Sequence, residues 1–164
     1  MRYILRQREV QADPWRRLDE PHAAGEALLV PAAELRREPA RWWGWSGRLG
    51  VQLAPPDRVE ELKEDLRRLD LVAVEFPAFG EGRGFSQARL LRERYGFRGE
   101  LRATGRGVTP DSAQLLVRCG FDAFEVASPA AGPALLAACE RYDVAYQPGA
   151  GGPVPRLQRF RRPS

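Results

Sequence analysis

The residues best suited to chemistry lie in one stretch, residues 75–106, where a short apolar strand is followed by a glycine- and arginine-rich loop and then a helix. Gly80, Gly82 and Gly84, together with Arg83, lie in the loop just before that helix, where glycine lets the backbone turn tightly. Backbone N–H groups and the positive end of the helix dipole face any anion at such a point. The stretch therefore predicts an anion-binding site, but three glycines outside a Walker A or GxGxxG motif name no reaction.

The charges at the start of this helix are unusual. Ser86 is the expected N-cap, and the first turn carries Arg89, with Arg83 just upstream, where Asp or Glu is usual. Such a charge costs a few tenths to about 1 kcal/mol unless an anion compensates it. The compensation comes either from a salt-bridged network of the protein or from a bound oxyanion such as phosphate, sulfate or sulfite. The carboxylates available for the network are Glu75, Glu81 and Glu100.

Polar groups also occur at the ends of predicted strands. Glu75 is the one charge of an apolar strand and lies near its carboxyl end, where it serves as an ion-pair partner or as a general acid or base. Glu100, Arg102 and Thr104 alternate along the next strand and therefore share one of its faces. Arg102 joins the anion-binding candidates, because this face either forms internal ion pairs or lines a pocket above Arg83.

Metal and redox cofactors are not indicated by the sequence. Cys119 and Cys139 are isolated and form no CxxC pair, so we expect a reduced, inert Cys119 and a core Cys139. His22 lies in a polar stretch and is expected at the surface. No iron–sulfur, siroheme, flavin or dinucleotide motif is present, so we expect no cofactor and no metal.

The net charge of +4 is weak evidence for a nucleic-acid partner, because nearly all basic residues are arginine and Lys63 is the one lysine. That bias is better explained by genome composition than by function. The strongest basic cluster is at the C-terminus, where we favour a solvated end over a phosphate-binding arm. Its members are Arg156, Arg159, Arg161 and Arg162.

Apolar strands alternate with amphipathic helices along the chain, a pattern typical of βα units. Asp57 and Glu60 form a capping-box arrangement, which predicts a helix with Val59, Leu62, Leu66 and Leu69 on one face. Other helices are expected between residues 31 and 39, after Ser86, from Thr109 to Gly120, and from Pro133. The expected strands span residues 3–5, 27–30, 49–53, 71–76, 100–104, 122–126 and 144–147.

These elements predict one α/β domain, residues 1–147, and a flexible Pro/Gly- and Arg-rich C-terminal tail, residues 148–164. The sheet should be mainly parallel, with six or seven strands in successive βα units. Because an eight-unit barrel needs more chain, an open twisted sheet and an incomplete barrel-like arrangement both remain. The N-terminus becomes charged after five residues and no apolar run approaches about 20 residues, so we expect a cytoplasmic protein with no membrane partner.

The run FPAFGEGRGFSQARLLRERYGFRGELRATG, together with LLVRCGFDAFEV, resembles the bacterial domain-of-unknown-function 934 family. The family pattern reads FPxFxDGRGxSxARLLRxRxGxxGExRAxGxVxxDQ and then RxGFDxF. The match is close over residues 75–126 and loose over most of the remaining chain. It covers the glycines and arginines named above and adds Asp111 as a supporting carboxylate. Glu81 replaces the usual aspartate, and Ser112 replaces the usual glutamine.

The resemblance implies a role beside assimilatory sulfite reduction. Members are usually described as oxidoreductases of that pathway and are encoded near the sulfite or nitrite reductase hemoprotein. Because the chain has no cofactor motif, we favour an accessory protein that acts with the reductase, or handles a small oxyanion for it. The alternative is an α/β enzyme that binds a phosphorylated or other oxyanionic molecule at the loop and helix from Gly82 to Arg89. We expect no nucleic-acid partner.

Overall fold

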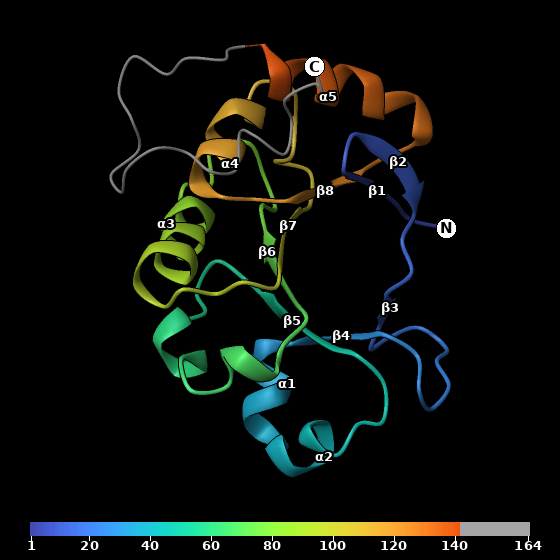
Figure 1. Cartoon of the computed structure of the whole chain (residues 1–164), viewed down its shortest axis with the longest axis vertical. Coiled ribbons are helices and arrows are strands. Elements are labelled where there is room, and N and C mark those ends of the chain that lie inside the picture. The colour runs from blue at the N-terminus through green and yellow to red at the C-terminus, as the bar shows by residue number, and fades with distance from the viewer. Residues whose placement is uncertain (142–164) are drawn as a thin grey trace.

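Five apolar strands that follow one another along the chain also lie side by side in space. In the computed structural model, which describes residues 1–141, each of these strands pairs in parallel with the next (Figure 1). The connections between them run through helical segments, as parallel pairing requires. The five strands are β4 (Leu28–Pro31), β5 (Leu49–Leu53), β6 (Leu71–Glu75), β7 (Glu100–Thr104) and β8 (Ala123–Val126).

Three N-terminal strands complete the sheet. β1 (Tyr3–Arg6) pairs antiparallel with β8 and with β2 (Glu9–Ala12), and β3 (Arg16–Arg17) pairs in parallel with β4. The order across the sheet is β2-β1-β8-β7-β6-β5-β4-β3. The protein is therefore α/β as expected, with a mixed sheet of eight strands.

The expectation of a mainly parallel sheet with six or seven strands was wrong. β2 was missed because its sequence, EVQA, is largely exposed, and because Gln7 and Arg8 form the tight turn with positive φ angles that usually require Gly or Asn. β3 has two residues, so its pairing depends on the neighbouring strand rather than on a local pattern.

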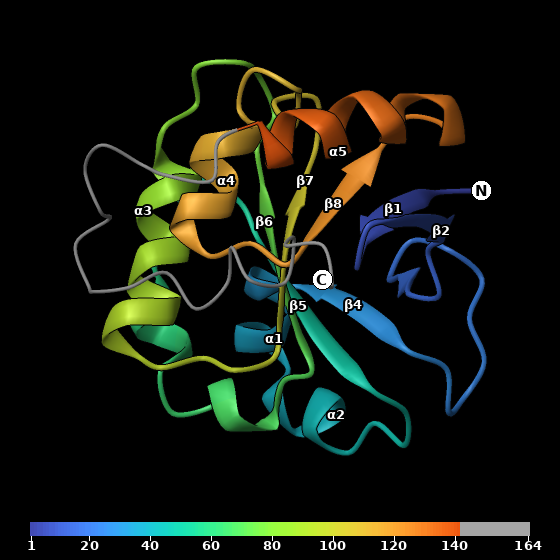
Figure 2. The same cartoon turned by 45° about the horizontal axis from the view of Figure 1, so that its top comes forward.

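The sheet is curled into a half-barrel (Figure 2). β2 and β3 stand at opposite ends of the strand order, yet residues 13–15 are all that separates them along the chain. This short connection links the two ends of the sheet. Of the two arrangements left open by the sequence, the chain adopts the incomplete barrel-like one.

Helices cover the outer face of the curled sheet (Figure 2). Alternate strand residues such as Val51, Val72, Val74 and Leu101 are buried there, because successive side chains of a strand point to opposite faces. The helices are α1 (Ala32–Arg37), α2 (Pro39–Trp43), α3 (Arg83–Arg89, continued by a π-helical turn Leu90–Arg94), α4 (Ala113–Cys119) and α5 (Gly132–Glu140).

The helix expected after Asp57 is replaced by two short 3-10 helices, η1 (Val59–Leu62) and η2 (Leu66–Arg68). Asp57 does not cap a helix, because its carboxylate accepts hydrogen bonds from the backbone N–H of Ala54 at 2.8 Å and from Arg36 at 3.0 Å. The predicted apolar face is nevertheless buried: Val59, Leu62, Leu66 and Leu69 all belong to the core. Periodicity thus identified the buried side chains but not the helix type.

The inner face of the sheet holds a smaller apolar cluster. Trp15 is buried against Leu29, Leu71 and Ala73, and a Cβ atom on Gly50 would lie 3.1 Å from its ring. Trp15 belongs to the connection between β2 and β3, so its ring fills the concave side where the two ends of the sheet meet. The expected strand 144–147, Tyr142 and the tail 148–164 lie outside the described residues.

Candidate functional site

A pocket of about 480 Å³ opens at the carboxyl ends of the parallel strands, on the inner face of the half-barrel. Its volume is within the range of small-molecule pockets, and the carboxyl ends of the strands are where βα barrels place their active sites. We call it the strand-end pocket. It is lined by Met1, Arg2, Arg17, Gln52, Glu75, Thr104, Gly105, Arg106, Val108, Glu125, Val126 and Ala127.

Glu75, the last residue of β6, lies in the strand-end pocket and is half-buried. The β6–β7 register places it opposite Thr104, whose hydroxyl donates to the backbone carbonyl of Val74 at 3.3 Å. The Glu75 side chain forms no ion pair or hydrogen bond with any residue of the described range. Its carboxylate is therefore available to a ligand, as the general acid or base interpretation requires.

Glu125 of β8 is the second carboxylate in the pocket, and it is fully engaged. Both of its oxygens accept hydrogen bonds from Arg17 at 3.1 Å, and it also accepts one from the backbone N–H of Gly105 at 3.3 Å. Arg17 belongs to β3, at the far edge of the sheet, so this pair spans the concave side. One nitrogen, Arg17 Nη2, donates to both oxygens, so the contact is a charge-assisted hydrogen bond shared between them.

Arg106 reaches the pocket from the loop that follows β7. The N–H of Gly107 donates to the carbonyl of Phe76 at 2.8 Å, which holds the loop against the end of β6. Gly105 has φ +93°, and a Cβ atom there would lie 2.5 Å from the Phe76 carbonyl oxygen. Only glycine fits at this position, where the loop passes close to the backbone at the end of β6. Arg106 is exposed and forms no ion pair or hydrogen bond with the described residues.

Arg102 points to the same inner face but lies deeper, within a chain of alternating charges. Its guanidinium donates to Asp13 at 2.9 Å and to Glu100 at 2.7 Å, and its side chain is 1% exposed. Glu100 also pairs with Arg6 at 3.1 Å. Arg102 is therefore neutralised by the protein, as the ion-pair interpretation expected, and the pocket that this face lines is not above Arg83.

Arg2 continues these ion pairs toward the N-terminal side. Its Nε lies 3.5 Å from Asp13, and its guanidinium pairs with Glu20. The Arg2 hydrogen bond, followed by one from the backbone N–H of Arg17, lowers the pKa of Glu20 to about 2. The Arg2 and Arg17 guanidiniums are thus engaged, which leaves Arg106 as the lining arginine without a partner among residues 1–141.

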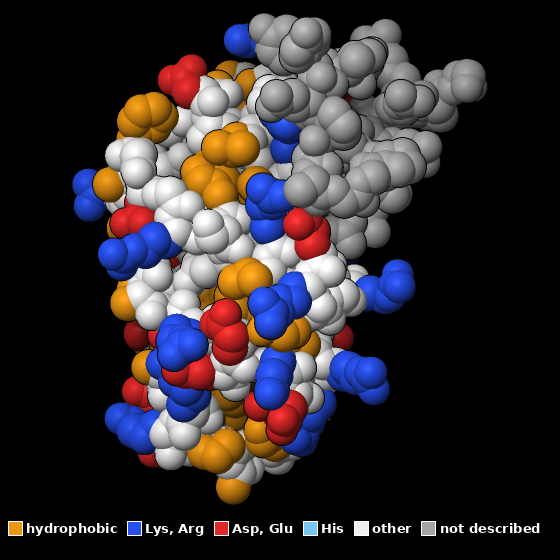
Figure 3. Space-filling view, turned by 90° about the vertical axis from the view of Figure 1, so that its left-hand side faces the viewer, with side chains coloured by type: hydrophobic (Ala, Val, Ile, Leu, Met, Phe, Trp, Pro, Cys, Tyr) orange, Lys and Arg blue, Asp and Glu red, His pale blue; other side chains and the backbone are white. Residues whose placement is uncertain are grey.

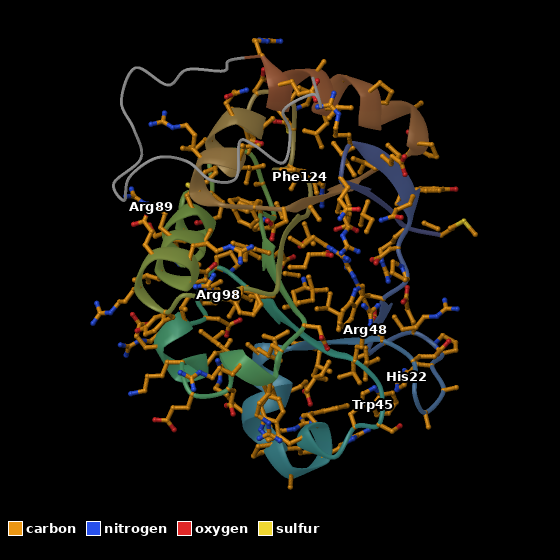
Figure 4. All side chains as sticks on the ribbon, in the orientation of Figure 1. His22, Trp45, Arg48, Arg89, Arg98 and Phe124 are labelled. Carbon is orange, nitrogen blue, oxygen red and sulfur yellow. The ribbon has the colours of Figure 1, made fainter. Side chains whose placement is uncertain are left out.

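The predicted loop and helix site lies elsewhere, on the outer side of the sheet. α3 begins at Arg83 with Gly82 as N-cap, four residues before the expected N-cap, so Ser86 lies within the helix rather than capping it. Glu81 instead accepts a hydrogen bond from the backbone N–H of Arg83 at 3.2 Å. Arg89 pairs with Glu93 at 3.3 Å and extends from the outer helix (Figure 4).

The helical face shows no single basic patch. On the described part of this side, acidic and basic side chains are interspersed (Figure 3). Arg83 and Ser86 line a shallow surface pocket of about 340 Å³, where Gln87 donates to the carbonyls of Ala54 and Asp57. Gly84 packs so closely that a Cβ atom would lie 2.5 Å from the Phe76 ring, which gives this glycine a packing role.

The other polar candidates lie outside the strand-end pocket. Asp111 is exposed at the start of the turn before α4. His22 packs its ring edge against Trp45, with centroids 5.8 Å apart, on the opposite side of the molecule from Arg89 (Figure 4). Burial raises the pKa of the Cys119 thiol and raises that of Cys139 to about 12, so neither is a thiolate at neutral pH.

The described part of the chain has neither a metal-binding cluster nor a membrane-spanning helix. No group of three or more His, Cys, Asp or Glu side chains within residues 1–141 is arranged to hold a metal ion. In the same range, no helix has the length and apolar character needed to cross a membrane.

The structure therefore separates the predicted site residues into three groups. Glu75 lines the strand-end pocket, Arg102 and Glu100 form buried ion pairs below it, and the Gly82–Arg89 residues lie on the outer helix. Sequence reasoning missed Arg106 and Glu125 as site residues. The signal that identified Glu75, a charge near the carboxyl end of a strand, applies equally to Glu125.

Comparison with known families gave one match. The model of a family described as "bacterial protein of unknown function (DUF934)" matches residues 50–157, which include β5 to β8 and therefore most of the strand ends around the pocket. No curated protein matches the chain.

Proposed function

Since the chain belongs to the bacterial DUF934 family, we propose that it is an accessory protein of assimilatory sulfite reduction that binds a small oxyanion in the strand-end pocket. The metabolic setting comes from the resemblance of residues 75–126 to family members encoded beside the sulfite or nitrite reductase. The single observation that supports binding is the guanidinium of Arg106, which lines the pocket and has no partner among the described residues. A guanidinium recognises oxyanions through paired N–H donors.

The pocket is favoured over the loop and helix from Gly82 to Arg89 because of its surroundings. Arg89 already has a carboxylate partner, and Arg83 lies on an exposed outer surface. In the strand-end pocket, by contrast, Arg106 lines a concave space together with the strand ends at Glu75 and Thr104. Partial removal of water strengthens an ionic contact there.

Binding can be tested with the full chain, using sulfite and inorganic phosphate as probes in thermal-shift and calorimetric titrations. A ligand that binds the folded state raises the melting temperature by mass action. We expect Arg106→Ala to weaken binding by about tenfold or more, which is the effect of losing a charged hydrogen bond. Arg83→Ala is the matched control and should bind as the unchanged chain does. Loss of binding in the Arg83 variant alone, or no binding by the unchanged chain, would overturn the proposed site.

The metabolic role is tested separately in cells. Tagged protein should co-purify with the sulfite reductase hemoprotein, and a strain lacking the gene should reduce sulfite poorly. If the unchanged gene restores sulfite reduction in this strain and the Arg106→Ala variant does not, the strand-end pocket is needed for the metabolic role. Absence of association together with normal sulfite reduction in the deletion strain would overturn it.

The alternative, an enzyme acting on a phosphorylated or other oxyanionic molecule, is supported by Glu75. A half-buried carboxylate without a described partner, beside an unpaired arginine, suits a general acid or base. This alternative expects the chain to convert a component of a cell extract and Glu75→Gln to abolish the conversion, as read by mass spectrometry. An extract left unchanged by the active chain would contradict it.

A further inference from the structure

The two free charges of the strand-end pocket have opposite signs. The Glu125 carboxylate accepts hydrogen bonds from Arg17 and Gly105, while the Glu75 side chain forms no ion pair or hydrogen bond with any residue of the described chain. Among the lining arginines, Arg106 is the one without such a partner in the same range. A ligand therefore meets an available guanidinium and an available carboxylate.

These two groups come from neighbouring strand ends. Glu75 ends β6, and Arg106 follows β7, which pairs with β6 along its whole length. The Phe76 N–H donates to the Thr104 carbonyl at 2.8 Å, and the Phe76 carbonyl accepts from Gly107. Backbone hydrogen bonds thus hold the residue after Glu75 against both sides of the Arg106 loop. The backbone positions that carry the two charges are therefore fixed relative to each other.

A carboxylate beside an oxyanion site discriminates between ligands by their protons. It repels a fully deprotonated oxyanion, because two negative charges meet in a partly desolvated space. It accepts a short, charge-assisted hydrogen bond from an oxyanion that still carries an O–H group. Hydrogen phosphate and the protonated form of sulfite carry such a proton near neutral pH, whereas sulfate does not.

We infer that Glu75 determines the specificity of the strand-end pocket, which takes oxyanions bearing a proton and rejects sulfate. The inference rests on the proposed function, since it assumes that Arg106 binds the oxyanion. Glu75 accepts the ligand O–H while Arg106 donates to the remaining oxygens. Rejection of sulfate would let the pocket retain a reduced or phosphorylated ligand in a cell that also contains sulfate.

The test is a set of calorimetric titrations of the full chain with inorganic phosphate, sulfite and sulfate at constant ionic strength. We expect sulfate to bind at least about tenfold more weakly than phosphate, the effect of one unfavourable buried contact. Sulfite affinity should fall as the pH is raised through neutrality, because its proton is lost. Glu75→Gln supplies an amide donor of the same shape and should reduce the phosphate-to-sulfate ratio to near one. Glu81→Gln, outside the pocket, should leave the ratio unchanged.

The possible failures are distinguishable. Equal affinity of the unchanged chain for phosphate and sulfate, with both lost in Arg106→Ala, would overturn the role of Glu75 and leave the oxyanion site standing. Binding of no oxyanion at all would overturn the proposed site and the inference together. A Glu75→Gln variant that folds, binds phosphate and still rejects sulfate would assign selectivity to another group and overturn the inference alone.

Discussion

At the scale of single residues, Arg102 shows how burial decides between a structural and a ligand-binding arginine. Its side chain is 1% exposed and meets two carboxylates, Asp13 and Glu100, which are 5% and 10% exposed. A charge buried this deeply is tolerated only where its partners are arranged around it. The free arginine of the same face, Arg106, is exposed instead.

We predict that Arg102→Leu lowers the free energy of unfolding by about 3–5 kcal/mol, because it removes the buried cation that Asp13 and Glu100 share and leaves each with one more exposed arginine. Urea denaturation measures the loss. Arg89→Ala, which removes an exposed pair between residues four apart in a helix, should cost no more than about 0.5 kcal/mol. If Arg102 were instead a ligand-binding residue, its replacement would weaken oxyanion binding at little cost in stability.

At the scale of elements, helix α3 is positioned by its glycine rather than by a capping side chain. Its N-cap is Gly82, and no side chain forms a capping hydrogen bond there. Gly84, the second residue of the helix, lies against the Phe76 ring, which itself packs on Phe85 and Phe121. This contact holds the first turn of α3 against the end of β6.

Gly84→Ala should therefore destabilise the protein by about 1–3 kcal/mol, because the enclosed Phe76 ring cannot move away from the new methyl group. Gly82→Ala is the matched substitution. It meets nothing within 4 Å and has φ −87°, so it should be neutral or slightly stabilising. Thermal unfolding of the two variants tests whether Gly84 is needed for packing against Phe76. Similar melting temperatures for the two variants would contradict this packing role.

At the scale of the whole molecule, ion pairs of the concave side connect the start of β1 with the chain beyond β3. Arg2 pairs with Glu20, which follows β3, and with Asp13 in the connection between β2 and β3. These contacts hold the two ends of the curled sheet together. Their strength depends on the ionisation of Glu20.

Acid should weaken the ion pair between Arg2 and Glu20, which helps to hold the two ends of the sheet together. The pKa of Glu20 is about 2 in the folded protein against an ordinary 4.5, so the unfolded chain takes up the proton first as the pH falls. The stability that Glu20 contributes is complete above about pH 4.5 and disappears as the pH approaches 2. The Glu20 side chain is 33% exposed, so added salt should reduce this contribution.

The measurement compares the unchanged chain with Glu20→Gln by urea unfolding across this pH range. The difference in unfolding free energy between the two should shrink steadily as the pH falls from 4.5 to 2. Glu64→Gln, at a site 86% exposed, is the control and should show no such trend. If the difference in unfolding free energy stays constant with pH, the ionised Glu20 carboxylate does not stabilise the contact between the two ends of the sheet.

The sequence by itself determined where several strands lie, which side chains are buried and where helix α4 ends. Apolar periodicity identified strands at 49–53 and 100–104 within the bounds of β5 and β7, and it identified the buried side chains even where the helix type was wrong. The C-terminal cap of α4 was also predictable, because Gly120 adopts the left-handed conformation that ends helices. These features depend on residues a few positions apart, whose spacing alone decides which side chains share a face.

Only the tertiary structure decided how the charges pair and where the pocket opens. Arg17 and Glu125 are 108 positions apart, and Arg102 and Asp13 are 89 apart. The curl of the sheet brings each pair together across its concave side, and no local pattern encodes that curl. Within residues 1–141, the Arg106 and Glu75 side chains have no partner for the same reason: the neighbouring charges Glu125 and Arg102 pair with residues brought from distant parts of the chain.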